Sequence, residues 1–269
     1  MATTAITRPA ARPRAKPGRR RRVVYYVLYV AVLLIAWEGL VRLLGIGRLL
    51  LPPPSAVAVE ALEFWELLLT SSAITLWEAT LGFAIAAVVG IGLALLITYS
   101  ATAATLIMTS LVAINATPKV AVAPILIIWL GLGIESKVAL AFLLSFFPIV
   151  VNAARGFADV PNELINLYRL MQASPRQLFL KVRMPSALPA IFDGLKIALP
   201  ISMVGAVAGE FVAARQGLGF QIVLAFSNFN SALVFAAVIL IAIEATILFQ
   251  IFSAIENRVL YWRPSREKF

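Results

Sequence analysis

The side chains in this sequence that could do chemistry are charged residues inside long apolar runs. Cysteine and histidine are both absent, which excludes disulfides, Cys/His metal sites and catalysis by Ser-His-Asp or Cys-His groups. Ionisable groups within or beside apolar runs include Glu78, Lys119, Glu210 and Glu244. Such a group in a membrane span faces a polar cavity or pairs with another charge. The sequence therefore points to a polar pathway or to buried charge pairs, and not to covalent catalysis.

Two of these residues each allow two interpretations. Glu210 lies near the end of its apolar run, so it either faces a pathway or caps the loop that carries Arg215. Lys119 either meets an anionic solute or pairs structurally with Glu78 or Glu244, and the structural pairing is favoured. Neither choice can be made from spacing alone.

The composition indicates an integral membrane protein. Hydrophobic residues make up 61% of the 269 residues and the mean hydropathy is +0.94, whereas globular domains contain roughly 45–50% apolar residues. The net charge of +10 could suggest nucleic acid in a soluble protein. Here the basic residues follow the positive-inside pattern of membrane proteins, so we expect a lipid bilayer and no nucleic acid as partner.

Six apolar runs are expected to cross the bilayer as helices, which makes the chain an all-α integral membrane protein. Seventeen of the 23 Lys and Arg residues fall in three segments that share one side when both termini are inside, the N-in and C-in topology. Lys137 is among the few basic residues on the outer side. The expected spans are residues 23–44, 72–99, 103–132, 138–154, 190–212 and 233–254.

The regions outside the spans are predicted as follows. Residues 1–22 form a disordered basic tail, residues 23–257 the transmembrane domain, and residues 258–269 a second basic tail. Residues 55–70 form an amphipathic helix along the outer interface or a solvated connector. The remaining expectations are loops at 131–137 and 213–231, an Asp193–Lys196 pair within one helix, and Asn228 and Asn230 as caps of the sixth span.

The third apolar run is broken by Pro118 and Pro124, with Asn115 beside the break. Irregular backbone at membrane depth is tolerated only where it is buried in protein or faces water. We therefore expect this run to line a cavity or a subunit contact. Trp129 near its end is either a packing residue or part of the same surface.

Residues 159–189 form the longest polar interruption of the chain and contain their own helix signals. Pro161 suits the first turn of a helix. Ser174 followed by Pro175 is typical of the N-cap and first position of a second helix, and Pro185 is expected to stop that helix. Two short helices set at an angle would make a docking element on the membrane surface. A plain polar loop between spans is the alternative.

This segment resembles the cytoplasmic EAA loop of bacterial ABC-importer permeases, E-A-A-x-x-x-G-x(9)-I-x-L-P. Val182-x-Met184-Pro185 stands where I-x-L-P falls in that pattern. The sequence departs from it at Asn166-Leu167-Tyr168, where E-A-A is usual, and at Gln172, where glycine is usual. The match rests on the spacing, the Ala173-Ser174 turn and the following prolines.

Three further elements resemble the nitrate/sulfonate/taurine (NitT/TauT) branch of these permeases. Leu51-Pro52-Pro53-Pro54-Ser55 is similar to its outer-face LPPPS element. Pro118 to Pro124 with the following Trp129-Leu130-Gly131-Leu132-Gly133 is similar to its P-x-x-A-x-x-P…W-x-G-x-G run. Gly209-Glu210 followed by Gly217-Leu218-Gly219 is similar to its E…GLG element. The resemblance covers residues 23–264.

The resemblance implies a type I ABC importer permease-like fold in the bacterial inner membrane. It implies a second permease copy, two ATPase subunits that carry ATP and Mg, and a periplasmic binding protein. The chain has no GxxxxGK[ST] phosphate loop, so we expect a translocation subunit without its own cofactor, and not an enzyme. The implied solute is a nitrate-, sulfonate- or taurine-like anion, or a pyrimidine or vitamin precursor.

The same resemblance assigns candidate site residues. ATPase coupling is expected of Leu164, Leu167, Tyr168, Arg169, Met171, Gln172, Ala173 and Arg176. The candidate translocation-pathway residues are Glu210, Lys119, Asn115, Trp129 and Glu78.

An ion-gradient-driven secondary carrier is the competing interpretation. In such a carrier Glu78, Glu210 or Glu244 would relay protons, and broken helices suit either class. A carrier has no need of a two-helix docking segment, which is why the importer is favoured.

Overall fold

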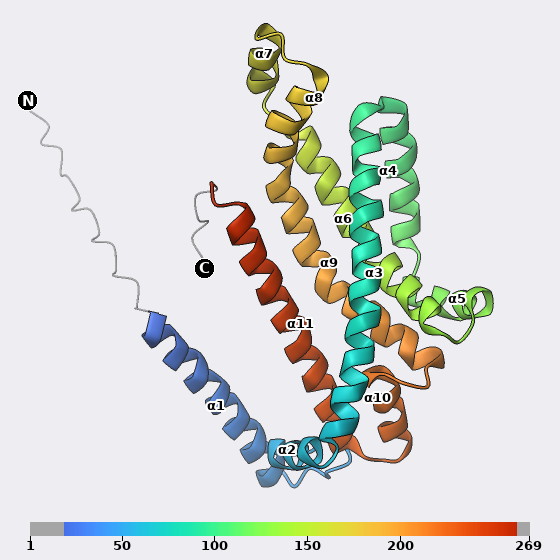
Figure 1. The fold of residues 1–269 in the computed structure, drawn as a ribbon. Helices are drawn as coiled ribbons and strands as arrows, with labels where there is room; N and C mark the ends of the chain where they lie inside the picture. The colour runs from blue at the N-terminus through green and yellow to red at the C-terminus, as the bar shows by residue number, and fades with distance from the viewer. Residues whose placement is uncertain (1–18, 263–269) are drawn as a thin grey trace, which may run out of the picture.

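All regular structure in the described part of the chain is helical, and the helices form an elongated bundle (Figure 1). The computed structural model describes residues 19–262. The helices are α1 (Arg19–Leu43), α2 (Pro54–Glu63), α3 (Trp65–Tyr99), α4 (Ala101–Ala116), α5 (Ala123–Leu130), α6 (Ile134–Ala158), α7 (Asn162–Leu170), α8 (Pro175–Leu178), α9 (Met184–Ala213), α10 (Leu218–Ser227) and α11 (Ser231–Val259). A 3-10 turn, η1 (Lys119–Val122), precedes α5, and a π turn, η2 (Phe179–Arg183), joins α8 to α9.

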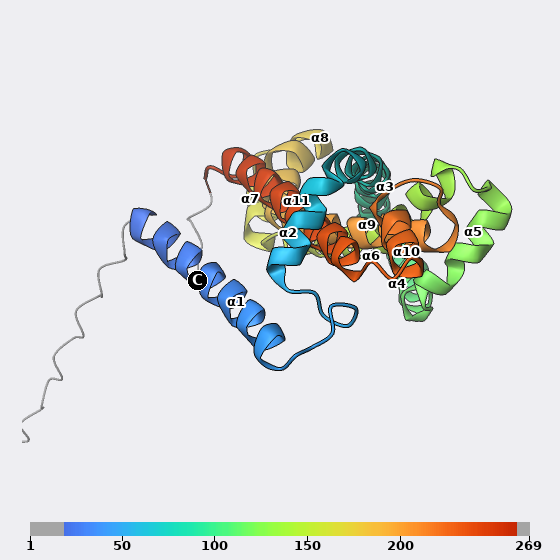
Figure 2. The same ribbon diagram turned by 90° about the horizontal axis from the view of Figure 1, so that it is seen from below.

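Helices α3, α6 and α9 form the centre of the bundle. The most extensive contact is between α6 and α9, followed by that between α3 and α6. Helix α4 flanks α3, whereas α11 lies on the other side of the centre and α1 diverges from it (Figures 1 and 2). The α7 end and the α10 end lie at opposite ends of the bundle (Figure 1).

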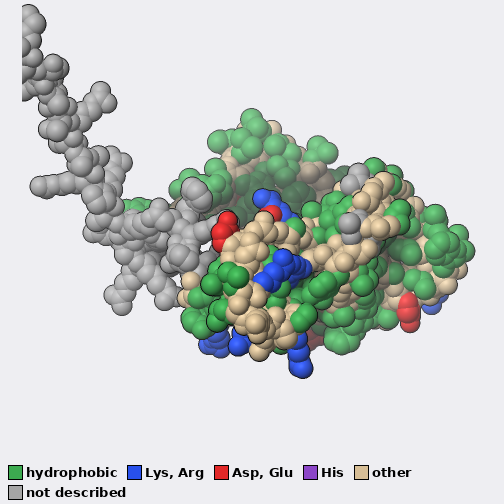
Figure 3. Space-filling view, turned by 90° about the horizontal axis from the view of Figure 1, so that it is seen from above, with side chains coloured by type: hydrophobic (Ala, Val, Ile, Leu, Met, Phe, Trp, Pro, Cys, Tyr) green, Lys and Arg blue, Asp and Glu red, His purple; other side chains and the backbone are tan. Residues whose placement is uncertain are grey.

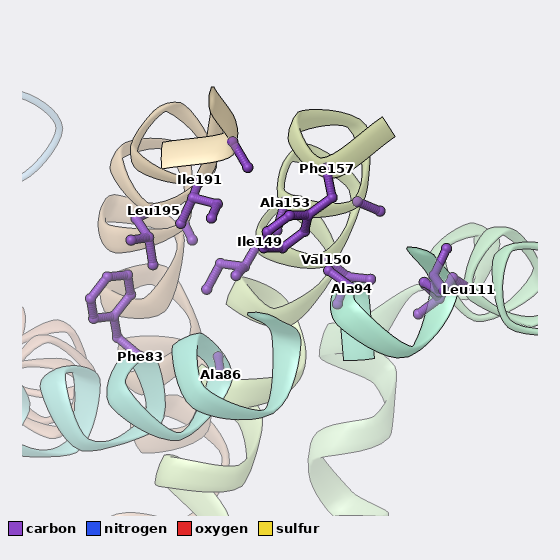
Figure 4. Close-up of a cluster of buried hydrophobic side chains, with 14 of the residues drawn as sticks. Phe83, Ala86, Ala94, Leu111, Ile149, Val150, Ala153, Phe157, Ile191 and Leu195 are labelled. Atoms are coloured by element: carbon purple, nitrogen blue, oxygen red, sulfur yellow. The ribbon is translucent and has the colours of Figure 1, made fainter. Parts of the chain in front are cut away.

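The core between these helices is apolar and built from residues far apart in the sequence. Phe83 and Ala86 of α3 meet Ile149 and Phe157 of α6 and Leu195 of α9 (Figure 4). In a bilayer lipid tails are as apolar as these side chains, so close van der Waals packing has to hold the helices together.

Small residues permit this close packing. A Cβ added to Gly82 of α3 would lie 2.6 Å from the Cβ of Ala141. A Cβ added to Gly205 of α9 would lie 2.6 Å from the Cα of Ala141. Ala141 of α6 is fully buried between these two glycines. The three central helices therefore cross where two glycines and one alanine replace larger side chains.

Four helices of the described residues are long and apolar enough to cross a membrane, and a fifth candidate is a helix pair bent by 86° at the break before Lys119. The break at Pro118 confirms the sequence prediction. Pro124 does not interrupt a helix, because it occupies the first turn of α5, where its missing N–H costs no hydrogen bond. The four are residues 65–99, 134–158, 175–212 and 231–259.

Several helices extend beyond the predicted spans. Helix α1 covers the first expected span and starts at Arg19, so residues 19–22, which were assigned to the tail, are helical. Helix α11 likewise continues to Val259, into the region assigned to the second tail. Residues 260–262 of the second tail form a turn, and tail residues 1–18 and 263–269 lie outside the described residues.

The prediction of a single amphipathic segment over residues 55–70 is wrong. Helix α2 ends at Glu63, and Phe64 leaves the helical region with φ −103° and ψ 25°. Helix α3 then begins at Trp65, seven residues before the expected start at Ser72, because residues 65–72 contain no helix breaker.

Both predicted outer loops are partly helical. Helix α6 begins at Ile134, so Lys137 lies within a helix and is buried, and its placement in an outer loop is wrong. The loop predicted for 213–231 contains α10, which is too short to be detected as a span. Asn230 caps α11 as predicted, since its Oδ1 accepts a hydrogen bond from the Leu233 N–H at 3.1 Å. Asn228 instead ends α10.

Pro185 does not stop the second helix of the polar segment, contrary to the prediction. The chain passes from α8 through η2 into α9, where Pro185 lies in the first turn. In η2 the Met184 N–H reaches back five residues to the Phe179 carbonyl. A wider π turn of this kind accommodates the proline without ending the helix.

The packing around Ala141 yields a stability prediction. We expect Gly205→Ala to lower the free energy of unfolding by about 1–3 kcal/mol, because the new methyl group meets backbone atoms of α6 that cannot move away. Gly92→Ala in α3 is the matched control, since nothing lies within 4 Å of its added Cβ. That control should be neutral or slightly stabilising because alanine favours the helix. Thermal unfolding of both purified variants checks this, and equal effects would contradict it.

Candidate functional site

Helix α7 presents an uncovered apolar face at one end of the bundle. None of its residues is buried, and Leu164 and Leu167 are exposed. Leu170 is 82% exposed and the adjacent Met171 is 69% exposed. Viewed from this end, basic side chains lie among hydrophobic ones (Figure 3). An exposed helix with this mixture of side chains is suited to insertion into a groove of another protein.

The end of α7 is a Schellman turn centred on Gln172, which has a φ of +56°. The Ala173 N–H donates to the Tyr168 carbonyl at 3.0 Å, and the Gln172 N–H donates to the Arg169 carbonyl at 2.9 Å. This left-handed position is the one that glycine occupies in the EAA pattern. The structure thus keeps the turn although glutamine replaces glycine.

The next helix starts as predicted at Ser174. Its Oγ accepts from the Gln177 N–H at 3.3 Å, and Gln177 Oε1 accepts from the Ser174 N–H at 2.8 Å. This capping box with Pro175 in the first turn confirms the predicted N-cap. Consecutive stop and start signals within three residues leave little freedom between α7 and α8.

Aromatic contacts fix this joint to the bundle. The Phe179 ring of η2 stacks on Phe157 of α6, with ring centroids 6.3 Å apart, and lies 6.5 Å from the Tyr99 ring at the end of α3. The Arg183 guanidinium lies 5.7 Å above the same Tyr99 ring. A displacement of α7 would therefore be felt by α3, α6 and α9.

The predicted residues of this segment all fall at the joint. Leu164, Leu167 and Arg169 are exposed on α7, whereas Tyr168 is half-buried. Met171, Gln172 and Ala173 form the turn itself, and Arg176 is exposed in the first turn of α8. Leu170 was missed by the sequence analysis although it is the most exposed apolar residue of α7.

A second cluster of ionisable and hydroxyl side chains is buried towards the α10 end. Glu210 of α9 is 1% exposed. Its Oε1 accepts from the Thr75 hydroxyl at 2.7 Å and its Oε2 accepts from the Gly219 N–H at 2.5 Å. Thr75 Oγ1 in turn accepts from the Leu218 N–H at 2.8 Å. Glu210 and Thr75 thus satisfy backbone N–H groups at the start of α10, as a helix N-terminus requires.

The glycines of the E…GLG element make room for this carboxyl group. Gly217 has a φ of +99°, which favours glycine. A Cβ added to Gly217 would run into the Glu210 carboxyl group, and one added to Gly219 would lie 2.7 Å from its Oε2. The acid and the two glycines therefore belong to one structural unit, although six residues separate Glu210 from Gly217.

Glu78 and Lys137 complete the cluster. Glu78 of α3 is 4% exposed and interacts with Glu210, so two predicted pathway residues are brought together. Lys137 of α6 is 3% exposed, and its ammonium group donates to the carbonyls of Leu132 (2.5 Å) and Gly133 (2.8 Å). It also interacts electrostatically with both glutamates. Hydropathy boundaries placed Lys137 in a loop, which is why the sequence analysis missed it.

Lys119 and Asn115 form a separate pair at the break of the third run. Lys119 donates to Asn115 Oδ1 at 2.5 Å and its ammonium group lies 5.6 Å from the centroid of the Phe147 ring. The favoured pairing with Glu78 or Glu244 is therefore wrong, because Glu244 accepts a hydrogen bond from Ser72 instead.

The other predicted residues of the apolar runs, Trp129, Asp193 and Lys196, lie outside both clusters. Trp129 lies apart on α5 and is 75% exposed. The predicted Asp193–Lys196 pair is confirmed at 3.7 Å, but Lys196 lies closer to Glu256 of α11, at 2.6 Å.

Comparison with known proteins places this architecture. Residues 86–261 match the family described as the binding-protein-dependent transport system inner membrane component. This chain belongs to that family. It is 34% identical over 240 residues to the formylaminopyrimidine transport permease protein ThiX of Halalkalibacterium halodurans, covering 89% of this chain and 96% of the relative. It is 30% identical to the taurine transport system permease protein TauC of Escherichia coli, covering 90% of each.

The fold agrees with a solved importer. An inward-facing structure of the MetNI methionine ABC transporter matches with a TM-score of 0.62 and 19% identity, covering 74% of this permease and 97% of that chain. The permease therefore has the type I ABC importer permease fold and is a multi-pass translocation subunit, not a catalytic one. These findings support the ABC importer over the secondary carrier.

The turn at Gln172 yields a second prediction. A left-handed backbone costs a non-glycine residue roughly 1–2 kcal/mol, so Gln172→Gly should keep the joint and raise stability by about 0.5 kcal/mol after the entropy cost of glycine. Gln172→Val should lower stability, because β-branched side chains tolerate this region worst. Thermal unfolding together with protease cleavage between α7 and α8 measures both variants. Greater stability of the valine variant would show that the turn is not left-handed.

Proposed function

We propose that this permease forms, with a second copy, the translocation pathway of an ATP-driven importer for a small polar solute. The observation that carries the proposal is the uncovered apolar face of α7 on a rigid joint, in a member of a binding-protein-dependent family. Two ATPase subunits, which hold ATP and Mg, would bind at the α7 end. A periplasmic binding protein would deliver the solute at the α10 end.

The coupling role falls to α7 and its joint. Leu164, Leu167 and Met171 would enter an apolar groove of the ATPase, with Arg169 and Arg176 pairing with its acidic groups. Tyr168, Gln172 and Ala173 would hold the angle at which α7 leaves the bundle. The movement of the ATPase pair would then pass into α8 and α9, and switch the pore between inward-open and outward-open states.

The pathway is assigned to the surface around the broken run. Lys119, Asn115 and Trp129 are the less buried of the candidates, and irregular backbone at this depth needs protein or water beside it. Glu210 and Glu78 would support the pathway without lining it, because both are buried within the packing of one chain. A cation at Lys119 suits an anion but also accommodates a neutral polar ring.

The solute class is drawn from the relatives. One relative is named for formylaminopyrimidine, a second for riboflavin at 32% identity, and others for aliphatic sulfonates and taurine at 31% and 30% identity. We propose a small polar solute of one of these two kinds, a pyrimidine or vitamin precursor or a sulfonate-like or nitrate-like anion.

The topology proposed for the permease has six spans with both termini in the cytoplasm of a bacterial inner membrane. Helix α1 would add a span to the four unbroken helices and the bent pair. The transmembrane domain would be residues 23–257, with the coupling loop at 159–189. Seventeen of 23 basic residues then lie on the cytoplasmic side.

The composition of the native assembly tests the proposal. The gently solubilised complex should have the mass of two permease copies with two ATPase subunits, measured by native mass spectrometry at low and high salt. Its co-purifying binding protein can then be screened against pyrimidine, vitamin and sulfonate ligands. A complex without any ATPase, together with uptake that needs only an ion gradient, would establish the secondary carrier instead.

Substitutions on α7 test the coupling residues. We expect Leu164→Asp and Arg169→Glu each to weaken ATPase association by at least about tenfold and to abolish coupled uptake, since central interface residues carry most of the binding energy. Arg155→Glu is the matched control. Arg155 is an exposed cation near this end, and its guanidinium lies 3.2 Å from the carboxylate of Asp159 in the same chain. Membrane insertion is checked by the amount of protein in the membrane fraction. Normal ATPase association of both α7 variants would show that the docking surface lies elsewhere.

A further inference from the structure

Two segments that leave the helices in the α10 half of the bundle are tied together by charged side chains. The first is the turn between α5 and α6, residues 131–133, and the second is the turn before α10, residues 214–217. They are separated by about eighty residues of sequence but meet the same buried cluster, formed by Glu78, Lys137 and Glu210. Neither segment can be held by regular backbone hydrogen bonds alone, because each lies between the end of one helix and the start of another.

Lys137 holds the first turn. Its ammonium group donates at 2.5 Å to the carbonyl of Leu132, which lies between α5 and α6, and at 2.8 Å to that of Gly133, the N-cap of α6, which also accepts from the Ser136 hydroxyl at 3.2 Å. The lysine backbone is itself clamped against α9, since a Cβ added to Gly209 would lie 3.1 Å from the Lys137 Cα. The residue before Glu210 is thus a glycine because α6 passes it at this point.

Glu210 holds the start of α10, directly after the second turn, through the Gly219 N–H at 2.5 Å and through Thr75, which accepts from the Leu218 N–H at 2.8 Å. Gly217 and Gly219 allow the carboxyl group to approach the backbone. Lys137 of α6 packs against Gly209, the residue before Glu210, and its ammonium group interacts electrostatically with the carboxyl groups of Glu210 and Glu78. One buried ammonium group therefore serves two carboxyl groups and two carbonyls.

We propose that Lys137 is a positioning residue that links the 131–133 turn to the start of α10 through Glu210, so that the two segments move as one unit. Removal of one member of a buried charge cluster leaves the others uncompensated, and the loss spreads to every group they hold. Loss of Lys137 would free the first turn directly and α10 indirectly. By reciprocity of coupling, loss of the Glu210 charge would loosen the first turn as well.

The link has a role in transport that rests on the proposed function. The first turn follows α5, which carries Trp129 of the proposed pathway, and α10 lies at the end where the binding protein would dock. A rigid connection between them would transmit docking at α10 to the broken run that lines the pathway. Lys137 would contribute to this without touching the solute.

Amide hydrogen exchange on the purified full-length permease tests the link without any partner. Lys137→Met should accelerate exchange at Leu218 and Gly219 by about tenfold, within the range of typical coupling factors, in addition to faster exchange in residues 131–133. Glu210→Gln should accelerate exchange in both segments too, which provides a second variant if the first does not accumulate in membranes. Lys137→Arg keeps the charge and should restore slow exchange at α10.

Lys196→Met is the matched control. It also removes a partly buried ammonium group, which lies 2.6 Å from Glu256, but at a different place in α9. It should leave exchange at Leu218 and Gly219 unchanged. The link is overturned if Lys137→Met affects residues 131–133 alone, or if Lys196→Met accelerates α10 to the same extent.

A functional measurement separates this inference from the proposed function. In the assembled importer, Lys137→Met should lower the ATPase activity stimulated by the binding protein about tenfold while basal ATPase activity stays unchanged. If no ATPase associates with the chain, the proposed function fails while the exchange result still stands. If stimulation is normal although α10 exchanges faster, the link exists in the structure but does not transmit docking, and its role in transport is overturned.

Discussion

A carbonyl or amide that leaves a helix inside a membrane needs a partner within the protein, because lipid offers none. This constraint explains the charged residues of the permease better than any need for chemistry. Lys137 donates to the carbonyls of the two residues before α6, and Glu210 with Thr75 accepts from the first two amides of α10. Where the chain turns at the opposite end, the Schellman turn at Gln172 does the same with backbone groups alone.

The constraint also explains what could be predicted from the sequence. Ser174 signals a helix start because its cap bonds to a residue three positions away, so all the atoms involved lie in one short stretch. The break at Pro118 is local in the same way. The partners of Glu210 come from α3 and α10, and contacts between such distant elements leave no periodic signal. The carbonyl partners of Lys137 lie only four and five residues before it, but no residue type marks them as partners.

Boundary errors had a different physical origin. Hydropathy marks where side chains change polarity, whereas a helix continues until its backbone bonds are broken. Pro185 is the clearest case, because the η2 turn absorbs the proline and the helix runs on. Lys137 was placed in a loop because it is charged, although its ammonium group lies among carbonyls and carboxyl groups inside the bundle.

The continuity of the chain through Pro185 gives the molecule its mechanical character. Residues 175–212 form one helical rod of 38 residues, which begins at the capped joint behind α7 and ends beside Glu210. Glycines at 194, 205 and 209 hold this rod against α6 at three levels along its length. A displacement at the α7 joint therefore passes into a continuous helix, which can bend at the η2 turn, Pro189 and Pro200, and the remainder appears as a movement of α9 against α6.

The charges that support the structure differ in burial from the one that could meet a solute. Lys137 and Glu210 are almost completely buried and bound to backbone groups, whereas the equally buried Glu78 interacts with Glu210 and has, among the described residues, no hydrogen-bond partner for its Oε2. Lys119 is less buried, and within residues 19–262 its contacts are with Asn115 and the Phe147 ring; it lies in the 3-10 turn that follows the break at Pro118. A charge that is fully engaged in supporting turns cannot also bind and release a passing solute without releasing those turns. Under the proposed function, selectivity is therefore to be sought around Lys119, and the buried cluster is the proposed support that holds the 131–133 turn and α10 in a fixed relation.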